Sequence, residues 1–327
     1  GYDLVRTAQT NIDLVFSGRN SITSDLKISY NLGGTVLDTR GDVTGISARK
    51  LIVPNRFNLA FAPQADQFNW NANTHVQRQA IWGTAQFSFK DFLYLDVTGR
   101  QEYFSTLPSP YSSFYPSAGL SVILSDMIKM PSIVDYAKVR VGYARTGGGG
   151  PPYLNKQTYT IYPNGIQRDV VSPFPDLEPE LTTGWEAGTE WRFFGNRLYF
   201  DVTFYKSNTT NQLLKEPTPP ATGYASQYIN AGDIQNSGVE VMLNVTPLKK
   251  AVTWDIGLNF ASNKSKVLEI LPGIDQVQLD QNFTDYVISV AKVGGAFGDL
   301  YAFGWKRNAS GDFIVATDGR PQRTDEI

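Results

Sequence analysis

The sequence predicts an all-β chain that forms part of an antiparallel transmembrane β-barrel, with about ten strands in up-and-down order. Three observations predict this fold. Apolar and polar residues alternate with a period of two in many segments, which is typical of strands with one apolar and one polar face. Short turns and long polar loops separate these segments alternately, as in outer-membrane barrels. No strong amphipathic helix connects the segments, so the strands should pair antiparallel.

The composition narrows the class of protein. The 327 residues are enough for one large β domain, and a net charge of -2 gives no reason to expect a nucleic-acid partner. The absence of cysteine excludes a disulfide scaffold and thiolate metal sites. The sequence contains no run of about 18 apolar residues, so it predicts no membrane-spanning helix. The strands of a membrane barrel lack such runs, because only every second residue faces lipid.

The first half of the chain should contain six strands, at residues 12–16, 26–32, 81–89, 93–100, 118–124 and 139–143. Short turns should join them in pairs at 17–20, 90–91 and 125–136, the last with room for one helical turn. Long polar loops should separate the pairs at 33–79, 102–114 and 147–180. This order places every long loop at the same end of the sheet.

Residues 181–260 contain the two hairpins with the clearest alternation, around turns at 195–196 and 247–252, with a long loop at 207–236 between them. After Asn263 the pattern blurs. The apolar face should contact lipid through Leu198, Phe200, Val202, Val239, Val241, Leu243, Trp254, Ile256 and Leu258. The polar face should line a lumen through Arg100, Arg140, Asp201, Thr203, Glu240, Asn244, Asp255 and Asn259. A wide lumen accommodates such groups, whereas a charge at the lipid midplane costs about 2–4 kcal/mol.

Residues that suggest catalysis or metal binding have simpler explanations. Glu178 and Glu180 flank Pro179 in a loop and face no opposing acid, so we interpret them as structural rather than as a glycosidase pair. The four glycines at 147–150 lack the Lys-Ser/Thr of a phosphate loop, and the single histidine, His75, cannot build a cluster. The spacing of Asp312, Asp318 and Asp325 does not match a calcium-binding EF-hand loop. We therefore expect no catalytic residue, metal or cofactor.

Several tyrosines in the long loops are candidates for solute contact. Their rings can stack on a sugar ring or a peptide, or they can order their own loops, and the sequence leaves both interpretations open. The candidates are Tyr111, Tyr153, Tyr159, Tyr162 and Tyr224.

Five motifs carry a resemblance to a known family. They are LYLDVTGR at 93–100 followed by STLP at 105–108, FYPS at 114–117, KVRVGYA at 138–144, LEPE at 177–180 with WEAG at 185–188, and NAGDIQNSGVE at 230–240. In this order and spacing they resemble the SusC/RagA class of TonB-linked outer-membrane transporters of Bacteroidetes. Each motif alone is modest, and their succession makes the resemblance specific.

The resemblance implies a location and a function. It implies a plugged barrel of 22 strands in the bacterial outer membrane, which imports an oligosaccharide or, as second choice, a peptide. It also implies a surface lipoprotein of the SusD type as partner, and TonB as a second partner through an N-terminal segment. We expect residues 1–327 to be part of one barrel domain, with a plug before Gly1 and further strands after Ile327. The rival interpretations are a passive porin and a soluble all-β glycan-binding protein or hydrolase.

Overall fold

A computed structural model describes residues 1–162, 165–279 and 287–324. Its main sheet has ten strands that pair in chain order, each antiparallel to its neighbours. The strands are β1 (Tyr2–Ser21), β2 (Leu26–Ala48), β3 (Gln67–Phe89), β4 (Leu93–Phe104), β5 (Ser112–Ile123), β6 (Val134–Gly148), β10 (Glu180–Phe193), β11 (Leu198–Pro217), β12 (Ser226–Lys249) and β13 (Thr253–Glu269). The predicted up-and-down sheet of about ten strands is confirmed. Two residues of β9 (Val171–Ser172) add the one short parallel pairing among the described strands of this sheet, with β12.

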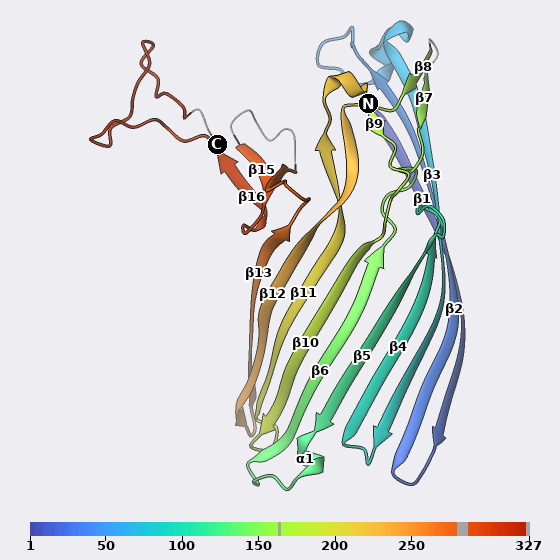
Figure 1. The fold of residues 1–327 in the computed structure, drawn as a ribbon, viewed down its shortest axis with the longest axis vertical. Helices are drawn as coiled ribbons and strands as arrows, with labels where there is room; N and C mark the ends of the chain where they lie inside the picture. The colour runs from blue at the N-terminus through green and yellow to red at the C-terminus, as the bar shows by residue number, and fades with distance from the viewer. Residues whose placement is uncertain (163–164, 280–286, 325–327) are drawn as a thin grey trace.

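Connections of two kinds alternate along the chain (Figure 1). Turns at 22–25, 90–92, 194–197 and 250–252, and a compact link with the single-turn helix α1 (Leu124–Met127), lie at one end. The long connections lie at the other end, at 49–66, 105–111, 149–179 and 218–225. In the turn between β3 and β4, Lys90 and Asp91 have φ of 50° and 56°, and the nearby Lys27 ammonium lowers the pKa of the Asp91 carboxyl through a hydrogen bond. None of the described helices is long and apolar enough to cross a membrane.

Several predicted boundaries were wrong because the strands are much longer than a membrane requires. The 23 residues of β2 extend over roughly 75 Å at about 3.3 Å per residue, whereas a tilted strand crosses a bilayer with about 9–11 residues. Most of the predicted loops at 33–79 and 207–236, and both ends of the predicted loop at 102–114, therefore belong to strands. The first turn lies at 22–25 rather than 17–20, and β12 continues to Lys249, through a register shift after Val245, before it turns.

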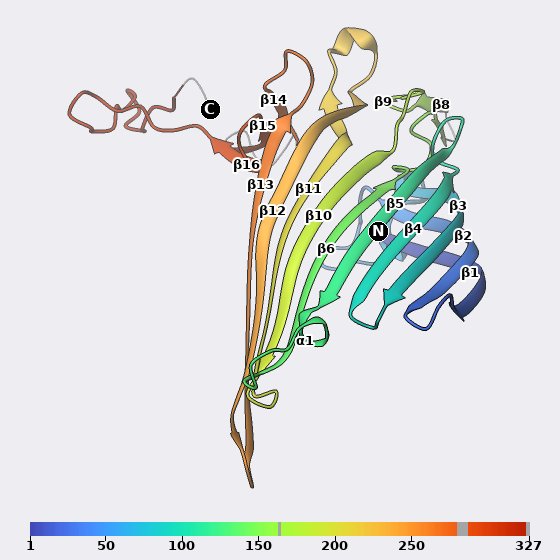
Figure 2. The ribbon, with the colours of Figure 1, turned by 60° about the horizontal axis from the view of Figure 1, so that its bottom comes forward.

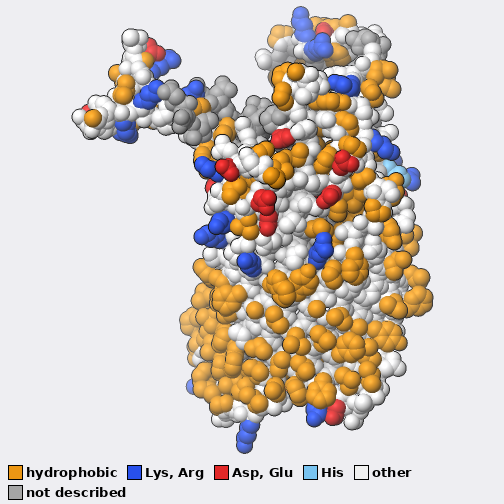
Figure 3. Space-filling model, viewed as in Figure 1, with side chains coloured by type: hydrophobic (Ala, Val, Ile, Leu, Met, Phe, Trp, Pro, Cys, Tyr) orange, Lys and Arg blue, Asp and Glu red, His pale blue; other side chains and the backbone are white. Residues whose placement is uncertain are grey.

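The register separates two faces of the sheet, because directly opposed residues share a face. One row joins Trp191, Phe200, Leu243 and Leu258, and the adjacent row on the other face joins Glu190, Asp201, Met242 and Asn259. Hydrophobic side chains cover the lower part of the surface in Figure 3, and most charged side chains lie above them. The sheet itself curves into an open trough between the edge strands β1 and β13 (Figure 2).

Two small hydrophobic clusters stabilise the end with the long connections. Phe104, Leu107, Tyr115 and Leu177 pack together and join the 149–179 connection to the ends of β4 and β5. The second cluster joins β11, β12 and β13 to a small sheet of β14 (Gln276–Gln278), β15 (Val287–Lys292) and β16 (Phe297–Ala302), through Leu214, Ala231, Val267, Ile270, Val277 and Ala291. The 149–179 connection carries a further hairpin of β7 (Tyr159–Tyr162) and β8 (Gly165–Arg168).

Candidate functional site

The best-formed polar group on the sheet lies where β6, β10 and β11 run side by side. The guanidinium of Arg140 donates to both carboxylate oxygens of Asp201, at 2.7 and 2.9 Å, and also to Thr203 Oγ1 at 2.5 Å. Asp201 and Thr203 lie two residues apart on β11, so both side chains project from the same face. The ion pair is one-third exposed at Arg140 and one-fifth exposed at Asp201, which places it at the surface of the polar face rather than in a core.

A glycine makes this contact possible. Arg140 on β6 and Asp201 on β11 are separated by β10, where Gly188 stands directly opposite Arg140. A Cβ at Gly188 would lie 2.8 Å from the guanidinium carbon, a distance that atoms in real structures do not tolerate. The glycine therefore leaves the space through which the arginine crosses a whole strand.

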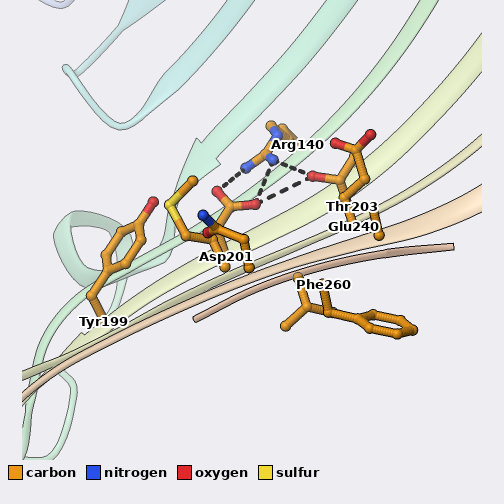
Figure 4. Close-up of a pocket in the computed structure, with 10 residues that line it drawn as sticks. Arg140, Tyr199, Asp201, Thr203, Glu240 and Phe260 are labelled. Atoms are coloured by element: carbon orange, nitrogen blue, oxygen red, sulfur yellow. Dashed lines mark hydrogen bonds and ion pairs between the residues drawn. The ribbon is translucent and has the colours of Figure 1, made fainter. Parts of the chain in front are cut away.

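The ion pair borders a shallow hollow of about 460 Å³. Glu240, Met242 and Asn259 from β12 and β13 line the hollow beside Arg140 and Asp201. Figure 4 shows Arg140, Asp201 and Thr203 on one side of the strands and Phe260 on the other. Glu240 is exposed and forms no ion pair within the described part of the chain. The hollow thus combines one neutralised ion pair with one free carboxylate.

The other predicted lumen residues lie apart from this hollow. Arg100 on β4 pairs with Glu102 at 3.2 Å, close to the buried Tyr115. Asp255 accepts a hydrogen bond from Thr246 at 2.6 Å, and Asn244 is exposed opposite Gly257. Their placement on a lumen wall stays a prediction, since the described chain forms an open sheet.

The loop tyrosines do not gather into one site. The ring of Tyr224 lies under the guanidinium of Arg168, 4.3 Å from its carbon, and its hydroxyl donates to Gln157. The hydroxyl of Tyr153 accepts from the backbone N–H of His75. Tyr111 and Tyr159 are exposed, and the side chain of Tyr162 lies outside the described residues. Tyr224 and Tyr153 therefore connect the 149–179 connection to its neighbours, and solute stacking stays a prediction for the group.

A clamp that sequence reasoning missed holds the base of the 149–179 connection. Asn230 of β12 accepts from the N–H of Glu178 at 2.7 Å and donates to the carbonyls of Glu178 and Asn211. The Glu178 carboxylate accepts from Asn211 Nδ2 at 2.7 Å, and the Glu180 carboxylate accepts from the N–H of Leu213. Both glutamates thus have structural partners. The NAG motif at 230–232 and the LEPE motif at 177–180 contain the asparagine and the two glutamates of this clamp, but the sequence does not show that the two motifs are in contact.

A metal site finds no support in the described residues. No group of three His, Cys, Asp or Glu side chains there is arranged to hold an ion. Asp312 closes a tight turn with Asn308, and Asp318 accepts from the N–H of Arg320. Asp325 lies outside the described residues.

Comparison with known proteins places this geometry in a family. Residues 2–321 match the family model described as TonB dependent receptor-like, beta-barrel. TonB-dependent receptor P26 of Formosa agariphila is 28% identical over 216 residues, which are 62% of this chain and 22% of the relative. TonB-dependent receptor SusC of Bacteroides thetaiotaomicron is 26% identical over 177 residues, 49% of this chain and 18% of SusC. The chain thus spans about a fifth of the length of these curated relatives.

Solved structures share the fold. The RagAB peptide importer in its closed-closed state matches with a TM-score of 0.79 at 18% identity, over 99% of this chain and 37% of that chain. The outer membrane transporter YddB of Escherichia coli matches with a TM-score of 0.59 at 14% identity, over 84% of this chain and 36% of that chain. With SusC, these matches confirm the resemblance that the sequence motifs predicted.

Proposed function

The chain belongs to the TonB-dependent receptor-like β-barrel family of the bacterial outer membrane, and on this basis we propose that it forms part of the wall of a TonB-dependent nutrient importer. The main observation in support is that the sheet has a polar face, around Arg140 and Asp201, and an apolar face on its opposite side. Such a wall separates lipid from a wet or plugged lumen. No bond is made or broken during this import.

The solute would be too large for diffusion through a porin, with an oligosaccharide as first candidate and a peptide as second. Similarity to the RagAB peptide importer supports a solute of this size. The connections at 49–66, 149–179 and 218–225 would contact the solute together with a surface lipoprotein of the SusD type. Loops on a rigid scaffold are where binding residues concentrate, and the contacts of Tyr153 and Tyr224 hold the middle connection in place between its neighbours.

The test is uptake by the full-length receptor that carries this chain. Replacement of residues 152–176 by a short Gly-Ser linker should abolish uptake of the solute while the barrel still assembles in the outer membrane. Uptake of labelled oligosaccharides and labelled peptides is measured in parallel, with and without TonB. Unchanged uptake after the replacement, or uptake independent of TonB, would count against the proposal.

A further inference from the structure

The outward apolar face ends at a defined row of side chains. Tyr143 of β6 and Trp185 of β10 are directly opposed, with ring centroids 4.7 Å apart. Near the other end of β10, Trp191 and Phe193 stack against Phe200. Residues 185–193 match the about 9–11 residues that a tilted strand needs to cross a bilayer. The Tyr143–Trp185 row is therefore the upper aromatic border of the membrane band.

Basic residues occupy this row and the row above it. The register continues the first row from Trp185 to Lys206, Ser237 and Lys264. The next row, two residues farther toward the long connections, joins Arg145, Thr183, Asn208, Gln235 and Lys266. Lys206 and Lys264 flank Ser237 at a spacing of roughly 10 Å, and the two rows lie roughly 7 Å apart. In Figure 3, basic side chains lie directly above the hydrophobic area.

The two rows contain four cations without acidic partners, which we call the basic rows: Arg145, Lys206, Lys264 and Lys266. Lys206, Lys264 and Lys266 are exposed, and none of the four forms an ion pair with any described residue. The Nε atom of Arg145 is buried without a hydrogen-bond partner among the described groups. The nearest carboxylates on this face, Asp233 and Glu269, lie one row higher, and Asp233 already accepts from Asn208 at 2.7 Å.

The same face of β2 and β3 is built differently. There Arg40 and His75 both contact Asp38, at 3.1 and 2.6 Å. The charge of Arg40 is therefore paired within the protein. The basic rows differ from this group in leaving their charge to an external anion.

We propose that Arg145, Lys206, Lys264 and Lys266 bind the phosphate groups of anionic lipid headgroups in the leaflet on the long-connection side, an inference that rests on the membrane placement of the proposed function. Lysine and arginine stems lie along apolar surface while their charges reach the headgroup layer. Ser237, Asn208 and Gln235 add hydrogen-bonding groups between the cations. A phosphate at this height is adjacent to the apolar band, which fits a headgroup with attached acyl chains rather than free phosphate.

The test uses the full-length receptor in nanodiscs with equal amounts of phosphatidylglycerol and phosphatidylcholine, and native mass spectrometry to count retained lipids. The wild type should retain phosphatidylglycerol preferentially. Combined replacement by glutamine at all four positions should lower that retention at least about tenfold, since each cation near an anionic surface contributes roughly fivefold. A variant with Lys206→Arg, Lys264→Arg and Lys266→Arg should behave as the wild type.

Arg40→Gln is the matched control, because it removes an outward-facing charge that already has a carboxylate partner. It should leave lipid retention unchanged. Equal retention by the wild type and the four-site variant would overturn the proposal, and so would displacement of the lipid by millimolar inorganic phosphate. Folding is checked by heat-modifiable migration, and if the four-site variant does not fold, Lys206→Gln with Lys264→Gln carries the test. Solute uptake is measured separately, so failure of the import function is distinguishable from failure of lipid binding.

Discussion

Arg140 and Asp201 form a two-pronged ion pair, at 2.7 and 2.9 Å, across an intervening strand. The pair connects β6 to β11 over Gly188 of β10, so one interaction stabilises three consecutive strands on the polar face. It also neutralises two charges where the hollow begins and leaves Glu240 as the free carboxylate. The ion pair therefore sets both the rigidity and the local charge of the wall.

Asp201→Asn should lower the free energy of unfolding by about 1–2 kcal/mol. Hydrogen bonds to charged groups contribute about 1.5–3 kcal/mol, and the partial exposure of Arg140 reduces that value. Urea unfolding of the receptor in lipid vesicles, followed by tryptophan fluorescence, measures the change. Glu240→Gln is the control and should change the free energy by less than about 0.5 kcal/mol, because this carboxylate is exposed. Equal effects of the two substitutions would contradict the assigned roles.

The effect of Gly188→Ala on the free energy of unfolding should have opposite signs in the wild type and in the Asp201→Asn variant. In the wild type the added Cβ displaces the guanidinium of Arg140, which would lie 2.8 Å away, and the lost ion pair should cost about 1 kcal/mol net. In the Asp201→Asn background no ion pair remains, and alanine should stabilise by about 0.5–1 kcal/mol because it loses less backbone entropy than glycine. Gly142→Ala, whose added Cβ would have no atom of another residue within 4 Å apart from its chain neighbours, should stabilise in both backgrounds. Additive effects of Gly188→Ala and Asp201→Asn would refute the crossing geometry.

The sequence predicted the strands best where they cross the membrane. Between lipid and lumen, apolar and polar residues must alternate, as they do from Leu198 to Phe204. Farther out, both faces of a strand contact water or other loops, so the alternation disappears although the backbone pairing continues. Residues 74–79 of β3 have the sequence THVQRQ, with a single apolar residue, and still pair with β2 in register.

The candidate site was predicted in part. Alternation placed Arg140, Asp201 and Glu240 together on the polar face, but their partners depend on register. Arg140 and Asp201 are 61 positions apart, and only the pairing of β6 with β10 and of β10 with β11 brings them together. The clamp at Asn230 lies beside an interruption of the pairing between β11 and β12, where Asn211 has φ of 56° and Gly232 of 85°, and a period of two contains no signal for it.

A positive charge should separate the two faces of β13 experimentally. Phe260→Arg lies in the row of Thr189, Val202 and Val241, midway along residues 185–193, and should cost about 2–4 kcal/mol in vesicles. Asn259→Arg, on the adjacent position and the opposite face, should cost less than about 1 kcal/mol. The same urea titration compares them. Comparable costs would mean that the polar face does not line an aqueous space.

Asn230→Ala should release the 149–179 connection without unfolding the sheet. The substitution removes three hydrogen bonds, one to the N–H of Glu178 and two to the carbonyls of Glu178 and Asn211. Local opening then becomes easier by about 1–3 kcal/mol, the cost of leaving such groups unpaired. Limited proteolysis of the receptor in vesicles should show cleavage within 149–179 accelerated about five- to a hundredfold, while heat-modifiable migration of the barrel stays the same.

Asn244→Ala, which replaces an exposed asparagine farther along β12, is the matched control and should leave the cleavage rate unchanged. Equal cleavage of the Asn230→Ala variant and the wild type would show that the hydrophobic cluster of Phe104, Tyr115 and Leu177 holds the connection without the clamp.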